Sequence, residues 1–285
     1  MPDPDARHPG VQLGILGLGR MAQALLLPLL EGNALQPDAV RAAVASDASA
    51  GRLREQLGLA VDTDPRPAWA APVVLLAVKP QQLEALAASL AVLEPSPPAP
   101  ASGASAPLPR LLISVLAGVS LARLQRLFPG CRCVRAVPNT PALVRAGLTG
   151  LAWGEGVEPA QREWVRALFA RVGEVLELPE SQLDAFLALT SSGPAFVALV
   201  AEAMADGAVA AGLPRLLAHH LAHRTLVGTA ALLHEQELHP GQLKDMVSSP
   251  GGTTIAGLRQ LERAGLRSAL LEAVLAAAER SRELA

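Results

Sequence analysis

A short apolar strand that runs straight into a glycine-rich turn and an apolar helix is the feature that most restricts how this chain can fold. Residues 11–16 have the sequence VQLGIL, residues 17–22 have the sequence GLGRMA, and apolar residues continue at helical spacing to Leu30. The G-x-G-x-x-A spacing lets a turn close tightly, brings the backbone up to a pyrophosphate and packs helix on strand through the small Ala22. Glycines at this spacing also occur by chance, so the prediction depends on the flanking strand and helix. Together they predict the first unit of a dinucleotide-binding domain.

Short β-like segments follow this unit and alternate with helical patterns. The segments span residues 40–45, 73–78, 111–115, 133–137, 148–153 and 174–178. Helical periods lie between several of them, at residues 51–57, 81–93 and 121–127. Strands that alternate with helices form a parallel sheet with helices on both faces. We therefore expect an α/β fold whose first domain, residues 1–178, is a Rossmann-type parallel sheet.

From about Pro179 onward the pattern changes to helical periods alone. These periods span residues 183–189, 194–211, 214–234, 241–247, 255–263 and 266–283. A run of helices after a run of alternating elements indicates a separate domain. We predict a second, all-helical domain over residues 179–285.

Composition agrees with two globular domains and disfavours a nucleic-acid partner. The chain has 285 residues, of which 51% are hydrophobic, and this is enough apolar surface for two medium-sized cores. Its 24 basic and 26 acidic residues give a net charge of −2. A chain with this balance has no basic field to attract a polyanion, so we expect no binding of nucleic acid.

Cysteine and histidine spacing gives no complete metal site. Cys131 and Cys133 form a lone C-x-C pair without a second cluster, which cannot close a zinc site. His219 and His223 are one helical turn apart and His220 lies between them, but no carboxylate or third ligand accompanies them. We predict buried thiols in a reducing compartment, histidines at a surface or interface, and no bound metal.

Three segments bear on where the protein resides. Residues 1–9 are acidic and proline-rich, without the basic start or apolar core of an export signal, and we expect a frayed tail there. The apolar stretch 196–213 carries Glu202 and Asp206, which favours a packed helix over a membrane span. Residues 94–107 are rich in Pro, Ala and Ser, which predicts a flexible surface loop away from the chemistry. We expect a cytoplasmic protein with no membrane contact.

The stretch 248–255, SSPGGTTI, is the strongest candidate for a binding site in the second domain. Gly251 and Gly252 allow close approach and left-handed dihedrals, and Thr253 and Thr254 open what looks like a helix. Backbone N–H groups at such a helix start converge on an anion, and a threonine hydroxyl can donate or accept beside it. A small carboxylate fits this pattern. An ordinary capped helix start after a turn is the other interpretation of the motif.

Three more turns follow strands on the same predicted rim of the sheet. Lys79-Pro80 ends one strand and could present a cation to ribose or phosphate, although a lysine at the end of a strand is more often simply solvated. Ala117-Gly118-Val119 is a second turn of small residues. Residues 135–141, RAVPNTP, contain two prolines that fix a rigid turn, whose Asn139 and Thr140 we expect to hydrogen-bond backbone rather than to act in chemistry.

Six segments in this order resemble the pyrroline-5-carboxylate reductase family. They are GILGLGRMA at residues 14–22, AVKPQ at 77–81, PNTP at 138–141, SGPAF at 192–196, HPGQLKD at 239–245 and SPGGTTIAGL at 249–258. The resemblance covers nearly the whole chain except the tail and the loop at 94–107. It implies a Rossmann domain followed by a helical domain that dimerises by interleaving helices, with larger homo-oligomers built from dimers. It also implies the last step of proline biosynthesis, in which NAD(P)H reduces the cyclic imine pyrroline-5-carboxylate to proline.

The resemblance also implies which residues form the site. The N–H groups around Gly251, Gly252, Thr253 and Thr254 would bind the carboxylate, while the Thr254 hydroxyl, as the catalytic group, would hydrogen-bond the ring nitrogen. Ser192 and Glu180 would lie near the substrate, although Glu180 taken alone indicates no more than an acid at a helix start. The implied coenzyme-binding residues are Leu16, Gly17, Leu18, Gly19, Arg20, Met21, Ala22, Ser46, Ala77, Val78, Lys79, Pro80 and Ala117.

Several residues depart from the family pattern. Ser191 replaces a glycine, which would strain the loop by roughly 1 kcal/mol if that position needs a positive φ. Arg20 stands where Asn or Gln is more common, and Asp64 where an asparagine near the nicotinamide ribose is common. Asp47 would repel a 2′-phosphate if it points inward, whereas Ser46, Ser49 and Arg52 could accept one. We expect NADPH on family grounds, with NADH also possible.

Two alternatives stay open. A 3-hydroxy-acid dehydrogenase or another imine reductase would share both domains, and Lys244 is then the candidate acid of the helical domain. A non-catalytic nucleotide-binding regulator is the other, although the complete Gly-Gly-Thr-Thr loop disfavours it. Neither the extent of oligomerisation nor the range of cyclic imines follows from the sequence.

Overall fold

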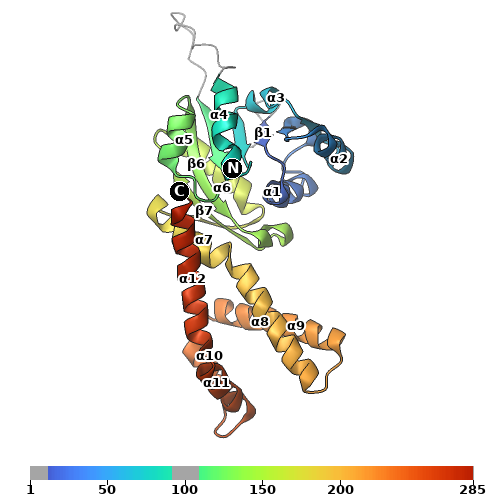
Figure 1. Cartoon of the computed structure of the whole chain (residues 1–285), viewed down its shortest axis with the longest axis vertical. Coiled ribbons are helices and arrows are strands. Elements are labelled where there is room, and N and C mark those ends of the chain that lie inside the picture. The colour runs from blue at the N-terminus through green and yellow to red at the C-terminus, as the bar shows by residue number, and fades with distance from the viewer. Residues whose placement is uncertain (1–11, 92–108, 285) are drawn as a thin grey trace, which may run out of the picture. The chain divides into compact units, whose positions relative to one another are not determined.

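The computed structural model describes residues 12–91 and 109–284, so the predicted tail at 1–9 and loop at 94–107 lie outside the described residues. The chain divides into two compact units (Figure 1). The sheet unit contains the residues up to Ser191 together with those from Ala278 onward, and the helical unit contains Ser192–Ala277. The domain boundary after residue 178 stays a prediction.

An eight-stranded sheet forms the centre of the sheet unit. Its strands are β1 Leu13–Leu16, β2 Val40–Ala43, β3 Ala60–Asp62, β4 Val73–Leu76, β5 Arg110–Ser114, β6 Cys131–Pro138, β7 Gly147–Trp153 and β8 Gly173–Glu177. Their order across the sheet is β3-β2-β1-β4-β5-β6-β7-β8. Because β1 lies between β2 and β4, the strand order reverses there, and such a switch point opens a crevice at the carboxyl ends of parallel strands.

The Rossmann-type parallel sheet is confirmed, with one pair that differs. β6 and β7 are antiparallel, while every other neighbouring pair is parallel. The short 3₁₀ helix η3, Thr140–Val144, connects these two strands. A parallel pair needs a crossover of a dozen or more residues, so a connection this short forces the chain to turn back.

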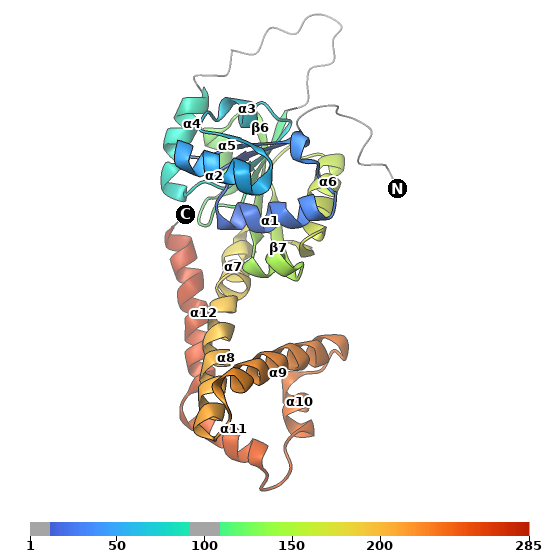
Figure 2. The ribbon, with the colours of Figure 1, turned by 90° about the vertical axis from the view of Figure 1, so that its right-hand side faces the viewer.

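Helices cover both faces of the sheet, and each face has its own apolar core. On one face the core takes side chains from α1 Arg20–Glu31, α2 Asp47–Leu57 and α6 Pro159–Ala170. On the other face it takes them from α3 Arg66–Trp69, α4 Leu83–Ala91, α5 Leu121–Leu127 and α7 Leu183–Thr190. Ile15 faces the first core and Leu16 the second, as the alternation of side chains along a strand requires. Both views of the ribbon show helices on the two sides of the strands (Figure 2).

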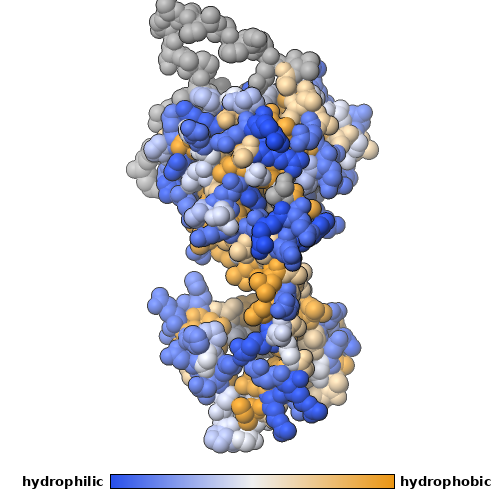
Figure 3. Space-filling model, turned by 60° about the vertical axis from the view of Figure 1, so that its left-hand side comes forward, coloured by the Kyte–Doolittle hydropathy of each residue, from blue (hydrophilic) through white to orange (hydrophobic). Residues whose placement is uncertain are grey.

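The helical unit confirms every helix expected in this part of the sequence. Its helices are α8 Gly193–Ala210, α9 Arg215–Glu235, α10 Pro240–Met246, α11 Thr253–Arg263 and α12 Leu266–Glu283, the last turn of which belongs to the sheet unit. α8 and α9 pack through the small buried side chains of Ala205, Ala218 and Ala222. Most of the unit's large apolar side chains are exposed, as the space-filling view illustrates (Figure 3).

Candidate functional site

The first glycine turn lies at the switch point of the sheet, against the end of β4. The Gly17 N–H donates to the Ala43 carbonyl at 2.8 Å, and the Ala77 N–H donates to the Leu16 carbonyl at 2.8 Å. Gly17 has φ +92°, and a Cβ there would lie 2.6 Å from the Ala77 carbonyl oxygen and 2.7 Å from the Val78 nitrogen. Only glycine fits this position without a backbone shift. The structure therefore brings together Gly17, Ala77 and Val78, three of the predicted coenzyme residues.

Gly19 opens α1 with space in front of it. It is the N-cap residue of α1, has φ −78° and ψ −171°, and provides no side chain to accept from the helix N–H groups. A Cβ at Gly19 would meet nothing within 4 Å. Leu18 and Ala22 are buried and anchor the turn, while Arg20 is exposed. Backbone N–H groups at an open helix start suit a phosphate, so these residues fit the pyrophosphate of a dinucleotide.

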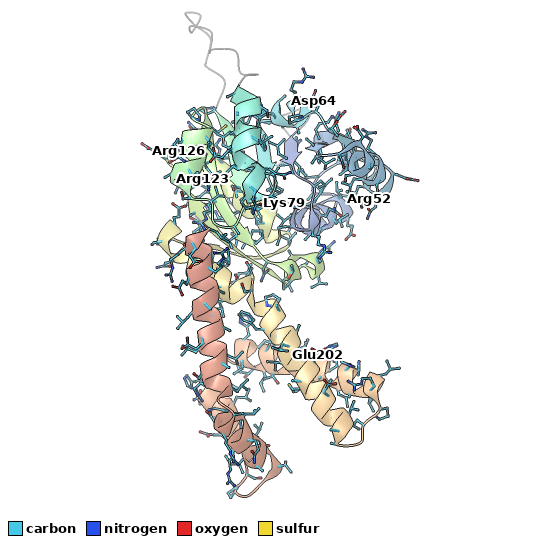
Figure 4. The ribbon with its side chains drawn as sticks, in the orientation of Figure 1. Arg52, Asp64, Lys79, Arg123, Arg126 and Glu202 are labelled. Atoms are coloured by element: carbon cyan, nitrogen blue, oxygen red, sulfur yellow. The ribbon has the colours of Figure 1, made fainter. Side chains whose placement is uncertain are left out.

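The loop after β2 presents both attractive and repulsive groups. Ser46 is the N-cap of α2, and its Oγ accepts from the Ser49 N–H at 3.4 Å. Asp47 follows it, is exposed, and its Oδ1 accepts from the Thr63 hydroxyl at 3.2 Å. Arg52, labelled on α2 in Figure 4, is exposed and donates to Gln56 Oε1 at 3.5 Å. In a dinucleotide site, this loop meets the adenosine ribose, so its charges bear on a 2′-phosphate.

The other rim residues follow β4 and β5. Lys79 is exposed beyond β4, and its N–H donates to Gln82 Oε1 at 3.4 Å, at the start of the 3₁₀ helix η2 Pro80–Gln82 (Figure 4). Ala117 is exposed after β5, and Gly118 next to it has φ +68°. Asp64 forms an ion pair with Arg66, and the Arg66 guanidinium holds the pKa of this carboxyl below its ordinary value.

Asn139, in the RAVPNTP turn, hydrogen-bonds backbone groups as expected. Its Nδ2 donates to the Thr190 carbonyl at 3.0 Å, and its Oδ1 accepts from the Leu148 N–H at 2.8 Å, so it ties β6, β7 and α7 together. Ser191 lies nearby and donates to the Pro138 carbonyl at 3.2 Å. Its φ is −92°, in the right-handed region, so the strain considered for a positive φ does not arise.

Glu180 belongs to a part-buried charge cluster around the buried Arg135 in the sheet unit. Its Oε1 accepts from the Leu121 N–H at 2.7 Å and pairs with Arg135 Nη1 at 3.3 Å. Arg135 Nη2 also pairs with Asp184 Oδ1 at 3.1 Å, and this oxygen accepts from the Ser281 hydroxyl at 2.8 Å. The Arg135 side chain is 3% exposed. The part of Glu180 in binding substrate stays a prediction.

The Gly-Gly-Thr-Thr loop lies in the helical unit, at the start of α11. Gly251 has φ +68° with open space beside it, and Gly252 is the N-cap residue, with no side chain to accept from the helix N–H groups. A Cβ at Gly252 would meet the Ser249 hydroxyl, so a larger residue here would require that side chain to rotate away. Thr253 and Thr254 begin the helix behind these glycines. The backbone N–H groups of this first turn suit a carboxylate.

Ser192 also belongs to the helical unit and precedes α8. It is half-buried, with φ −86° and ψ −31°, and its carbonyl accepts from the Ala195 N–H at 3.0 Å. The predicted coenzyme residues thus lie in the sheet unit, and the predicted substrate residues other than Glu180 lie in the helical unit. Within the described residues, no three His, Cys, Asp or Glu side chains form a group that could hold a metal ion.

Known proteins that resemble this chain in sequence include both halves of the molecule. A sequence model of the pyrroline-5-carboxylate reductase dimerisation domain matches residues 180–284, and one described as NADP oxidoreductase, coenzyme F420-dependent, matches residues 12–97. A pyrroline-5-carboxylate reductase from Synechocystis sp. is 47% identical over 275 residues, which are 96% of this chain and 98% of the relative. The chain belongs to the pyrroline-5-carboxylate reductase family.

Solved structures with the name pyrroline-5-carboxylate reductase or pyrroline carboxylate reductase share the fold over the same length. The protein from Coxiella burnetii has a TM-score of 0.81 at 32% identity and covers 96% of this chain and 98% of its own. The protein from Plasmodium falciparum, solved with NADP bound, has a TM-score of 0.82 at 26% identity, with the same two coverages. The fold expected for a pyrroline-5-carboxylate reductase is therefore confirmed.

Some residues of this pyrroline-5-carboxylate reductase family member were not identified from its sequence. Arg135 is a charged residue between the apolar Val134 and Ala136, which is a signal for a buried ion pair, but its partners are far away in the chain. Ser281 and Leu284 lie in the last turn of α12 and its end, and only the fold shows that they belong with the sheet unit. Ser248 Oγ is buried without a hydrogen-bond partner in the described chain, at the start of the Gly-Gly-Thr-Thr loop.

Proposed function

We propose that this chain is a pyrroline-5-carboxylate reductase that uses NAD(P)H to reduce the cyclic imine to L-proline, the last step of proline biosynthesis. The observation that carries the proposal is the 47% identity to a pyrroline-5-carboxylate reductase over 96% of the chain. The glycine cradle at Gly17 and Gly19 and the open start of α11 supply the two binding features that this reaction needs.

In this proposal the coenzyme lies along the rim of the sheet unit. The pyrophosphate meets the N–H groups at the start of α1, which Leu18 and Ala22 anchor and from which Arg20 and Met21 project. Gly17 packs on Ala77 and Val78, so the turn and the end of β4 form one surface. When bound, NAD(P)H supplies the hydride that reduces the C=N bond. The complete proposed set is Leu16, Gly17, Leu18, Gly19, Arg20, Met21, Ala22, Ser46, Ala77, Val78, Lys79, Pro80 and Ala117.

The substrate is held by the helical unit through its carboxylate and its ring nitrogen. The N–H groups after Gly251 and Gly252 donate hydrogen bonds to the carboxylate, and the positive potential at the start of α11 favours its negative charge. The Thr254 hydroxyl hydrogen-bonds the ring nitrogen and fixes the orientation of the imine carbon. We assign Ser192 to the same pocket by family resemblance.

Reduction of the imine requires little from the protein beyond this positioning of the substrate. A hydride adds to the imine carbon, the electron pair of the C=N double bond moves to nitrogen, and nitrogen gains or keeps one proton to give the secondary amine. Because a protonated imine is already electrophilic, no strong general acid is required. The protein's own contribution is orientation of the ring and exclusion of water from it.

NADPH is the proposed coenzyme, with NADH as a weaker substitute. Ser46, Ser49 and Arg52 are available at the loop after β2 for a 2′-phosphate, and Asp47 on the same loop opposes it. The structure of the Plasmodium falciparum relative with NADP bound supports the same choice.

The active form is a homo-oligomer, built from dimers that the helical unit forms. The family match over residues 180–284 supports this assembly, as do exposed apolar side chains such as Leu216, Val227 and Met246, which are 87%, 60% and 67% exposed in the single chain. The helical stretch Glu180–Ala210 is long and apolar enough to cross a membrane by length and composition, with 17% of its apolar window buried. We assign its apolar surface to a second copy of the chain, in a cytoplasmic enzyme without nucleic-acid or membrane partners.

Initial rates with the purified chain test the proposal. NADPH should be oxidised in the presence of pyrroline-5-carboxylate, with L-proline formed in equal amount. Reduction of a 3-oxo acid without turnover of pyrroline-5-carboxylate would favour a hydroxy-acid dehydrogenase, in which the exposed Lys244 would be the acid. Binding of coenzyme without turnover of either substrate would favour a regulator.

A further inference from the structure

The part-buried charge cluster around Arg135 connects directly to one of the turns on the coenzyme rim. Glu180 Oε1 accepts from the N–H of Leu121, the first residue of α5, at 2.7 Å. Leu121 comes two residues after the turn Ala117–Val119, which follows β5. The carboxylate therefore fixes the exit of this turn.

Arg135 in turn fixes the carboxylate of Glu180. Its guanidinium is buried, and it has one carboxylate on each of its terminal nitrogens, Glu180 at 3.3 Å and Asp184 at 3.1 Å. A buried guanidinium needs such partners, because an unpaired charge in the interior is costly. Arg135 pairs in the sheet with Ser114, the last residue of β5, so the cluster lies level with the carboxyl end of that strand.

The end of α12 holds the same turn from a second direction. The Ser281 hydroxyl donates to Asp184 Oδ1 at 2.8 Å, the oxygen that also faces Arg135. Leu284 lies on the turn itself, because a Cβ added to Gly118 would come within 2.5 Å of Leu284 Cβ. Gly118 has φ +68°, so the turn depends on a glycine, and Leu284 packs against it.

We propose that Glu180 and Arg135, with Asp184 and Ser281 behind them, are positioning residues for the nicotinamide half of the coenzyme. This inference rests on the proposed function, since it needs a dinucleotide on the rim. In a Rossmann-type sheet each half of the strands serves one mononucleotide, and the turns after β4 and β5 belong to the half opposite the adenosine loop after β2. Glu180 then acts through the Leu121 N–H and the turn, rather than by touching the imine.

Direct binding measurements separate this role from general stabilisation. NADPH and adenosine 2′,5′-bisphosphate, which represents the adenosine half alone, are titrated against the parent and against Glu180→Ala. We expect the Kd for NADPH to rise about tenfold and the Kd for the bisphosphate to stay within about twofold. Glu180→Gln keeps an oxygen for the Leu121 N–H, so NADPH affinity should return to within about threefold of the parent.

Glu158→Ala is the matched control. Glu158 pairs with Arg132 at 2.8 Å, so this variant also breaks a carboxylate–arginine pair to β6, but near the start of the strand rather than beside Ser114. It should leave both Kd values unchanged. If Glu180→Ala does not fold, Ser281→Ala, which removes only the hydroxyl on Asp184, should raise the Kd for NADPH about threefold in its place.

Three results would overturn the inference: equal loss of NADPH and bisphosphate binding, a Gln variant as weak as the Ala variant, or a higher KM for the imine with unchanged NADPH affinity. The last result would instead support direct contact between Glu180 and the substrate. Failure of the parent to turn over pyrroline-5-carboxylate would count against the proposed function, and the binding comparison would still test the positioning role.

Discussion

Gly17 lies so close to Ala77 that a Cβ at Gly17 would stand 2.6 Å from the Ala77 carbonyl oxygen. This contact joins the turn after β1 to the end of β4, the two strands at which the strand order reverses. Gly19, two residues later, has open space where its side chain would be. The same motif thus contains one glycine required by the fold and one that leaves space for a ligand.

Gly17→Ala should lower the stability of the protein and abolish coenzyme binding. The added methyl group meets the Ala77 carbonyl, and φ +92° is unfavourable for alanine, so we expect a loss of about 2–4 kcal/mol in the free energy of unfolding. Urea unfolding, followed by circular dichroism, measures this loss. An unchanged midpoint would show that the turn is not packed as described.

Gly19→Ala is the matched substitution, with the opposite balance of effects. Its methyl group meets no protein atom within 4 Å and its φ of −78° suits alanine, so stability should stay within about 0.5 kcal/mol of the parent. The methyl group would stand where backbone approaches the pyrophosphate, and the Kd for NADPH should rise about tenfold or more. Calorimetric titration with NADPH measures it, and unchanged affinity would place the coenzyme elsewhere.

The strands and helices were largely predictable because their apolar spacing is local information. The elements β3 and α3 were not predicted because they are short, spanning only Ala60–Asp62 and Arg66–Trp69. The longer helix α6 was not predicted either. The antiparallel β6–β7 pair follows from the length of one connection, and the expectation of a parallel sheet overlooked that length.

Coenzyme preference should respond to charge at the loop after β2. Asp47→Ala removes a negative charge from that loop, so kcat/KM for NADPH should rise about fivefold relative to NADH. Arg52→Ala removes a positive charge from the same helix and should shift the ratio by a similar factor in the opposite direction. Steady-state rates with both coenzymes give the two ratios. Parallel changes for NADPH and NADH would argue against a 2′-phosphate at this loop.

Cys133 should lower stability in alkaline solution. Burial, with a smaller effect of Cys131, raises the pKa of its thiol from 9.0 to about 12. The contribution of the neutral Cys133 thiol to the free energy of unfolding is complete below pH 9. It declines by up to about 1.4 kcal/mol per pH unit as the pH rises toward 12, because the thiol of the unfolded chain loses its proton first. Urea unfolding of Cys131→Ser should therefore lose more stability between about pH 9 and 10 than Cys131→Ser/Cys133→Ala. Equal slopes would contradict this.

Thr254→Val should slow the reaction without changing the affinity for the coenzyme. Valine keeps the shape of the side chain but removes the hydroxyl that we assign to the ring nitrogen, so kcat should fall about 100-fold or more. Thr254→Ser keeps a hydroxyl and should stay within about tenfold of the parent. The Kd for NADPH should be the same in all three proteins. A parental kcat in the valine variant would show that the Thr254 hydroxyl is not catalytic.

The local geometry of the candidate site was predictable where its residues lie in contiguous motifs, as in GLGRMA and SPGGTTI, each of which begins a helix after glycines. It was not predictable where it depends on pairs distant in sequence. Arg135, Glu180 and Ser281 come together only through the fold, and no local pattern indicates that Glu180 faces the start of α5. The strain considered at Ser191 depended on a backbone angle, and the observed φ of −92° removes it.

The rate of NADPH oxidation with pyrroline-5-carboxylate, combined with chiral analysis of the product, tests the central claim most directly. The account predicts one L-proline for each NADPH oxidised, and no comparable oxidation with a 3-oxo acid. NADPH oxidation that requires a 3-oxo acid, or no proline from pyrroline-5-carboxylate, would contradict it.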